Sequence, residues 1–190
     1  MQTLRLRLTK AALIVGAGDA TGGAIARRFA KEGYITCVTR RIVEHLEPLA
    51  ERIRKDGGVV HPFGSDARDE QEVATLFAHI EQEIAPIEVV VFNVGANVRF
   101  DIADTTERVY RKVWEAGALA GFLVGREAAR VMEPRGRGSI FFTGATASLR
   151  GGSGYAAFAS AQFGLRGVAQ ATARELGPKN IHVVHLLIDA

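Results

Sequence analysis

The residues Ala11–Ile25, AALIVGAGDATGGAI, lead from a short apolar segment through a glycine-rich turn into a helix. Five consecutive apolar residues, Ala11–Val15, predict a parallel strand that is buried on both faces. The glycines at 16, 18 and 22 carry no Cβ, so the backbone can turn sharply and come close to a pyrophosphate. Free N–H groups at the start of the following helix would stabilise its charge. The stretch therefore predicts a nucleotide cofactor.

The residues that follow complete a βαβ unit. A helix over Ala20–Lys31 leads through Gly33 to a second apolar run, Ile35–Val38, within the roughly 30 residues that dinucleotide binding requires. The alternative is a turn with a structural role alone. The residues expected to bind the cofactor here are Gly16, Gly18, Asp19, Ala20, Thr21 and Gly22.

The second strand ends in Thr39-Arg40-Arg41. An Asp or Glu at this position would hydrogen-bond the ribose of NAD, whereas an arginine would meet the 2′-phosphate of NADP. The arginines favour NADP over NAD because no acid stands at this strand end. The alternative is that Arg40 and Arg41 are solvated charges that open a helix over Ile42–Lys55.

Composition indicates one domain over residues 1–190. The chain is 47% hydrophobic and has no proline- or serine-rich linker. Its net charge of +3 is spread over scattered arginines, which argues against nucleic acid as a partner. The single cysteine, Cys37, lies inside a predicted strand and is expected to be a small core residue. No metal site is predicted.

The ends and the hydropathy pattern indicate a cytoplasmic protein without a membrane partner. No apolar run reaches membrane-spanning length. The start MQTLRLRLTK lacks the apolar core of a secretory signal. Residues 1–10 are expected to form a loosely ordered basic arm.

Strands and helices continue to alternate along the chain. This pattern predicts a Rossmann-type, doubly wound α/β fold, with six parallel strands and right-handed crossovers that place helices on both faces. The remaining predicted elements are strand Val59–Phe63, helix Asp69–Ile84, strand Val89–Asn93, helix Thr105–Met132, strand Ser139–Thr143, helix Tyr155–Leu176 and strand Ile181–Ile188. Ligands bind beyond the carboxyl ends of such strands. The loops of interest are Gly16–Gly22, Gly64–Arg68, Val94–Asp101 and Gly144–Gly154.

Several motifs carry a family resemblance. Gly16, Ala20 and Gly22 fall on a Thr-Gly-x-x-x-Gly-x-Gly turn, with Ala20 in place of the middle glycine. Asp66 follows the third strand, and Phe92-Asn93-Val94-Gly95 stands where Asn-Asn-Ala-Gly is usual. Over nearly its whole length the chain resembles a short-chain dehydrogenase/reductase. The resemblance implies NAD(P)-dependent oxidation or reduction of a small carbonyl or alcohol substrate, with Asp66 on the adenine and Asn93 and Gly95 in the cofactor site.

The four positions of the family's catalytic residues are all changed. Gly117 replaces the asparagine and Ala145 the serine, and the Tyr-x-x-x-Lys frame begins at Phe158 and ends at Gln162. Phe158 has no proton to give, and loss of a general acid lowers a rate by about 10²–10⁴-fold. Gln162 is uncharged but can still hydrogen-bond a ribose hydroxyl.

Two hydroxyls could substitute for the missing groups. Tyr155 lies one helical turn before Phe158, and Thr146 adjoins Ala145. The alternative is that Tyr155 is a packing aromatic at the helix entry and Thr146 a loop hydroxyl. Two functional hypotheses therefore stay open: an NADP-dependent oxidoreductase, and a cofactor-binding pseudoenzyme that acts as a sensor or assembly partner.

Association is expected through the helices 105–132 and 155–176. Their small residues would allow close helix approach between two copies, namely Ala116, Ala120, Ala161 and Gly164, with Trp114, Phe122 and Phe163 as anchors. The alternative is that these residues pack only within one chain. The family's seventh strand and the segments that cover its substrate lie beyond Ala190, so the resemblance implies a homodimer rather than a tetramer.

Overall fold

The computed structural model describes residues 10–188. Six parallel strands form one sheet in the order β3-β2-β1-β4-β5-β6. The strands are β1 (Ala11–Val15), β2 (Ile35–Arg40), β3 (Val59–Gly64), β4 (Ile87–Phe92), β5 (Gly138–Gly144) and β6 (Ile181–Leu187). The order reverses between β1 and β4, and the predicted doubly wound α/β fold is confirmed.

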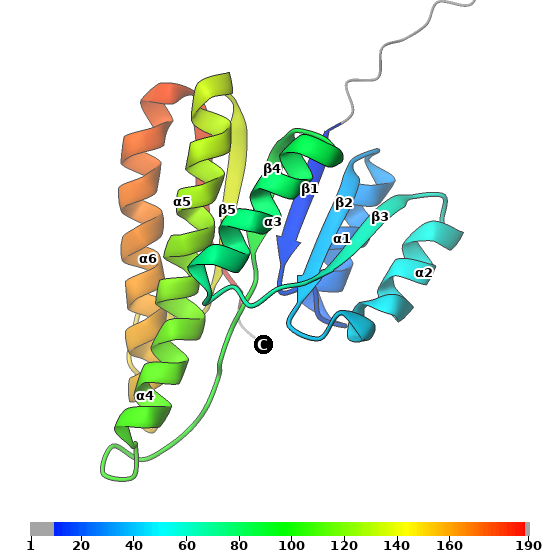
Figure 1. The fold of residues 1–190 in the computed structure, drawn as a ribbon. Coiled ribbons are helices and arrows are strands. Elements are labelled where there is room, and N and C mark those ends of the chain that lie inside the picture. Colours follow the sequence, from blue (N-terminus) through cyan, green and yellow to red (C-terminus); the bar gives the residue numbers. More distant parts are fainter. Residues whose placement is uncertain (1–9, 189–190) are drawn as a thin grey trace, which may run out of the picture.

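Helices cover both faces of the sheet (Figure 1). They are α1 (Thr21–Lys31), α2 (Glu47–Lys55), α3 (Glu70–Glu83), α4 (Glu107–Trp114), α5 (Ala120–Met132) and α6 (Ala156–Leu176). The alternation of side chains along the buried β1 divides the core between the faces. Leu13 and Val15 pack with α3, α5 and α6, whereas Ala12 and Ile14 pack with α1 and α2. Cys37 is fully buried, and burial raises the pKa of its thiol to about 12.

The predicted helix over Thr105–Met132 is wrong as one continuous α-helix. A π-helical segment, Glu115–Leu119, separates α4 from α5. Gly117 lies in this segment against α6, where an added Cβ would come 3.0 Å from the Cβ of Ala161. The small side chains let the π-helical segment and α6 approach each other closely, so the irregular turn lies at this contact.

Three of the four small residues expected between two copies pack within the chain, whereas the fourth, Ala116, is half-buried and lines a cleft. Ala120 and Ala161 are buried in the monomer. A Cβ on Gly164 would come 3.0 Å from the Cβ of Ala118. The expectation that these positions line a surface between two copies is therefore wrong for Ala120 and Ala161, because α4, the π-helical segment and α6 already pack on one another.

The predicted helix starts come one to five residues too early, and two of them have a clear local cause. The predicted helix over Ile42–Lys55 begins as a 3₁₀ turn, Val43–Leu46, and becomes α-helical only at Glu47, where Pro48 fits the first turn. Asp69 caps α3 instead of belonging to it, because its side chain accepts hydrogen bonds from the backbone N–H groups of Gln71 and Glu72.

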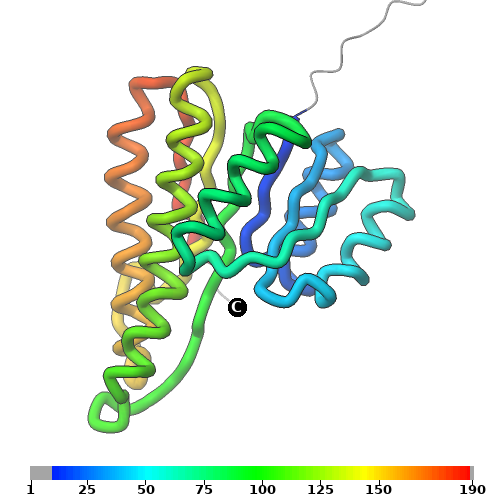
Figure 2. The backbone as a smooth tube through the Cα atoms, viewed as in Figure 1, coloured from blue at the N-terminus to red at the C-terminus, as the bar shows by residue number. Residues whose placement is uncertain are grey.

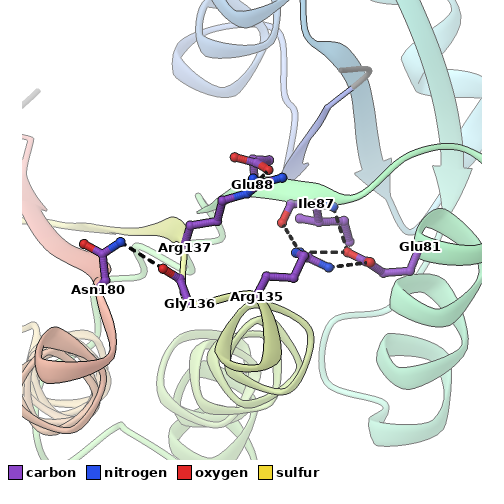
Figure 3. Close-up of polar contacts among 7 residues, drawn as sticks. All are labelled: Glu81, Ile87, Glu88, Arg135, Gly136, Arg137 and Asn180. Atoms are coloured by element: carbon purple, nitrogen blue, oxygen red, sulfur yellow. Dashed lines mark hydrogen bonds and ion pairs between the residues drawn. The ribbon is translucent and has the colours of Figure 1, made fainter. Parts of the chain in front are cut away.

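The amino-terminal edge of the sheet is held by partly buried ion pairs. Figure 3 shows Arg135 between Glu81 and the backbone of Ile87. Its guanidinium donates to the Glu81 carboxylate at 2.7 Å and to the Ile87 carbonyl at 2.7 Å, while Glu81 also accepts from the Ile87 N–H. These contacts tie α3 and the end of α5 to β4.

The opposite edge carries the long loops. The connection from β4 to α4 passes the carboxyl ends of the strands, and α4 begins well beyond that edge (Figure 2). The ends of β1 and β6 lie on the same side of the sheet as this connection, because neighbouring strands of the sheet are parallel. Among residues 10–188, no helix is long and apolar enough to cross a bilayer, and no group of three or more potential metal ligands occurs.

Candidate cofactor and substrate site

The glycine turn after β1 is pressed against the end of β4. Gly16 has φ +84°, and a Cβ there would lie 2.6 Å from the Asn93 carbonyl oxygen. The Asn93 amide donates back to the Gly16 carbonyl at 3.1 Å, and its backbone N–H donates to Val15 at 2.8 Å. Asn93 thus holds the glycine turn against the end of β4. Gly18 has open space around it, which leaves its backbone accessible.

The same turn is bound to β2 on its other side. The backbone N–H groups of Gly16 and Ala17 donate to the Thr39 carbonyl at 3.2 and 3.1 Å. No side chain caps α1 at Ala20, and its first turn contains no acid. The Gly23 N–H donates to the Gly18 carbonyl at 2.8 Å, whereas the N–H groups of Thr21 and Gly22 remain available to an anion such as a pyrophosphate.

A cleft of about 380 Å³ opens beside this turn. Its walls come from the loops after β1, β2, β3 and β4 and from α4. It brings together the predicted Gly16, Arg40, Arg41, Asp66 and Gly95, and it adds Ser65, Ala67, Arg68, Val94, Ala96, Lys112 and Ala116 to the lining. Three of the four expected loops contribute to this lining, namely Gly16–Gly22, Gly64–Arg68 and Val94–Asp101, whereas Gly144–Gly154 does not.

Arg40 and Arg41 differ in their surroundings. Arg40 is partly buried, and its guanidinium donates to the His45 carbonyl at 3.3 Å and to Asp19 at 3.5 Å. The Asp19 side chain is 90% exposed, so this pair is weak and easily exchanged. Arg41 is exposed at the cleft. Both guanidinium groups can turn to a phosphate.

Asp66 is held by an arginine that the motifs did not indicate. Arg68 donates to its carboxylate through Nε at 2.9 Å and through its backbone N–H at 3.1 Å. These hydrogen bonds lower the pKa of Asp66 and raise that of Arg68. The carboxylate is therefore ionised and rigidly oriented. The sequence offered one signal for this pair, an arginine two residues after the predicted acid. It offered none for Lys112, which reaches the cleft only because of how α4 packs.

The altered catalytic frame is filled by packing and by a short hydrogen-bond chain. Phe158 is buried in a small apolar cluster with Val113, Ala157 and Ala161. Gln162 is only 3% exposed, and its Oε1 accepts from the Ser148 hydroxyl at 3.0 Å. Ser148 in turn accepts from the Ala145 N–H at 3.3 Å. Sequence reasoning missed Ser148, since nothing in its spacing indicates a partner fourteen residues away.

A second cavity of about 520 Å³ lies beside this frame, and we call it the distal cavity. Both hydroxyl candidates, Thr146 and Tyr155, line it together with Ala145 and Phe158. The other lining residues are Asn97, Ala147, Arg150, Gly151, Gly152 and Ile188. The structure therefore gathers two of the four altered positions, Ala145 and Phe158, and both possible substitutes around one space, whereas Gly117 and Gln162 do not line it.

Comparison with known proteins agrees with this arrangement. A family model described as short chain dehydrogenase matches residues 10–187. The chain belongs to this family. A short-chain dehydrogenase from Rhodopseudomonas palustris is 57% identical, with a TM-score of 0.91 over 97% of this chain and 86% of that one. A polyketide ketoreductase solved with NADPH, of the actinorhodin system, is 27% identical, with a TM-score of 0.89 over 93% of this chain and 69% of its own.

Curated relatives are about as similar in sequence as the ketoreductase. The 3-oxoacyl-[acyl-carrier-protein] reductase MabA of Mycobacterium bovis is 28% identical over 176 residues, which are 92% of this chain and 66% of that protein. The human dehydrogenase/reductase SDR family member 4 is 29% identical over 92% of this chain and 63% of its own length. The chain thus spans about two thirds of the length of these short-chain dehydrogenase relatives.

The glycine turn makes a paired prediction. Gly16→Ala should lower the free energy of unfolding by about 1–3 kcal/mol, because the new Cβ meets the Asn93 carbonyl at a positive φ. Gly18→Ala is the matched control and should change stability little, since its surroundings are open. Urea unfolding of both variants measures the difference. Equal midpoints would show that the turn tolerates a side chain at 16.

Proposed function

We propose that this short-chain dehydrogenase relative binds NADP(H) in the cleft beside the glycine turn. The observation that carries the proposal is the end of β2, where Arg40 and Arg41 line the cleft and no Asp or Glu follows the strand. A phosphate pairs strongly with guanidinium groups, whereas a ribose hydroxyl favours an acid. The NADPH in the similar polyketide ketoreductase supports this choice.

Three parts of the chain would hold the cofactor. The N-terminus of α1 would bind the pyrophosphate, the two arginines the 2′-phosphate, and the ionised Asp66 would lie at the adenine. When bound, the nicotinamide supplies or accepts a hydride. Gly95 and Gly16 have no side chain that would fill the cleft. Lys112 and Arg68 add positive charge to its lining.

Hydride transfer by the parent protein should be slow. Reduction of a carbonyl needs a proton at the oxygen as the hydride arrives, and Phe158 cannot donate one. Ala145 removes a hydrogen bond to that oxygen, a loss that typically lowers a rate by about 10²–10³-fold. Gln162 carries no charge with which to lower the pKa of a neighbouring acid, and its carbonyl is committed to Ser148. We therefore favour cofactor binding with weak turnover.

A second candidate function is carbonyl reduction through displaced hydroxyls. Tyr155 and Thr146 both line the distal cavity beside Phe158 and Ala145. A phenol and an alcohol in that place could donate a proton and a hydrogen bond to a substrate oxygen. A steady-state panel of carbonyl substrates with NADPH, after its binding is established by titration, separates the two functions.

The cofactor proposal predicts a change of preference. Arg40→Asp with Arg41→Ala should weaken NADPH by at least about tenfold and NADH far less, because a guanidinium–phosphate pair is replaced by repulsion. Fluorescence titration with both cofactors measures this. Arg52→Ala, on the exposed face of α2, is the control and should change neither. Equal losses for the two cofactors would contradict the assignment of the 2′-phosphate.

The altered frame predicts a non-additive gain. Phe158→Tyr, Gln162→Lys and Ala145→Ser together should raise NADPH oxidation with a cyclic ketone, whereas each alone should do little, since the phenol needs the cation and both need the oxygen held. The comparison is with the parent and with Tyr155→Phe. A parent that is already fast, and that Tyr155→Phe slows strongly, would favour the displaced tyrosine and overturn weak turnover.

We also propose that two copies associate through the outer faces of α4, α5 and α6. Trp114, Phe122 and Phe163 expose 40%, 44% and 46% of their surface there. Large aromatic side chains of this kind are typical anchors of an interface. The contact would be a two-fold one, in which the same face is used by both copies.

This surface predicts that Phe163→Arg separates the copies. The expected result is a dimeric parent and a monomeric variant by light scattering at tens of micromolar, because a charge would be buried against an apolar partner. Ile42→Arg, an exposed apolar residue away from these helices, is the matched control and should leave the dimer intact. A monomeric parent, or a dimer that Phe163→Arg leaves unchanged, would contradict the proposed contact.

A further inference from the structure

The distal cavity has a mixed lining without an acid. Its apolar side chains are Ala145, Ala147, Phe158 and Ile188. Its polar side chains are Asn97, Thr146, Arg150 and Tyr155, all of which can donate hydrogen bonds. A ligand that fits this lining has an apolar body and a group that accepts hydrogen bonds.

Arg150 is the charged group of this lining, and its place is set by the backbone. Its N–H donates to the Thr146 carbonyl at 3.2 Å, which closes the turn after Ala145. The side chain is exposed, and the ion pairs of residues 10–188 do not include it. The guanidinium therefore needs to break no protein contact before it binds an anion.

A second arginine approaches the same loop from the β4–α4 connection. The Phe100 N–H donates to the Gly154 carbonyl at 2.9 Å and joins the two loops. The neighbouring Arg99 lies across Gly154, where an added Cβ would come 3.0 Å from its Cγ and Nε. Arg99 is likewise without an ion pair in the described chain. Arg150 therefore lines the cavity itself, and Arg99 lies against Gly154, between the lining residues Gly152 and Tyr155 in the sequence.

We propose that the distal cavity takes a small carbonyl or alcohol compound that carries a carboxylate. Arg150 binds the carboxylate, Arg99 adds to the positive field, and the apolar side chains of the lining hold the carbon chain beside Phe158. The planar guanidinium fork matches a carboxylate in two parallel hydrogen bonds. This inference rests on the proposed function, because it names the substrate class of the site that NADP(H) would serve.

The test compares 4-oxopentanoate with its methyl ester on the NADPH-loaded protein. The two probes share the ketone and the carbon chain and differ in charge. Calorimetric titration should give about tenfold tighter binding of the acid, the usual size of a hydrogen bond to a charged group. Arg150→Gln should abolish this difference, and Arg99→Gln should reduce it. Arg52→Gln, an exposed arginine on α2, is the control and should preserve it.

The outcomes separate this inference from the proposed function. Equal affinity for acid and ester on protein that binds NADPH, or an acid preference that survives Arg150→Gln, overturns the carboxylate site alone. Failure to bind NADPH overturns the cofactor proposal, and the same acid–ester comparison on the cofactor-free protein then decides the Arg150 assignment. Inorganic phosphate is included as a competitor. If it displaces 4-oxopentanoate and binds more tightly, the site favours phosphate and the carboxylate assignment is wrong.

Discussion

The close contact between the glycine turn and the ends of its two neighbouring strands is the constraint on which the site depends. Gly16 lies where any Cβ would strike the Asn93 carbonyl, and it is hydrogen-bonded to Thr39 on one side and to Asn93 on the other. The turn is therefore held against the ends of β2 and β4. Because the turn stays close to the sheet, α1 begins at the carboxyl edge, and the N–H groups of Thr21 and Gly22 in its first turn are left without a partner in the described chain.

The alternation of apolar runs and amphipathic stretches was enough to predict the sheet, since the central strands are buried, whereas the edge strands β3 and β6 are partly exposed. The doubly wound arrangement and the meeting of three loops at the cleft followed from general rules for parallel sheets. The break at Glu115–Leu119 was not predictable in this way, because it depends on how closely Gly117 approaches a helix forty residues later. Ala120 and Ala161 were wrongly assigned to a surface between two copies for the same reason. The sequence shows that their side chains are small, but it does not show which element packs against them.

The site was predictable where a motif fixes the backbone and less so where side chains choose their partners. The glycine turn and Arg40 are read directly from their place after a strand. The bidentate pair of Arg68 with Asp66 and the pairing of Ser148 with Gln162 depend on rotamers and burial, which spacing does not reveal. These partners matter for function, because they decide whether the Asp66 carboxylate is ionised and which end of the Gln162 amide is free.

The changes in the catalytic frame support one another physically. The Ala145 N–H donates to Ser148, and the Ser148 hydroxyl donates to the carbonyl of Gln162, so each buried polar group has a partner. A lysine introduced alone at 162 would bring a charge into a site that is 3% exposed and would leave the Ser148 hydroxyl without its acceptor. Phe158 is similarly embedded among apolar neighbours. These positions therefore form a consistent packing, in which a single reversal costs stability before it contributes chemistry.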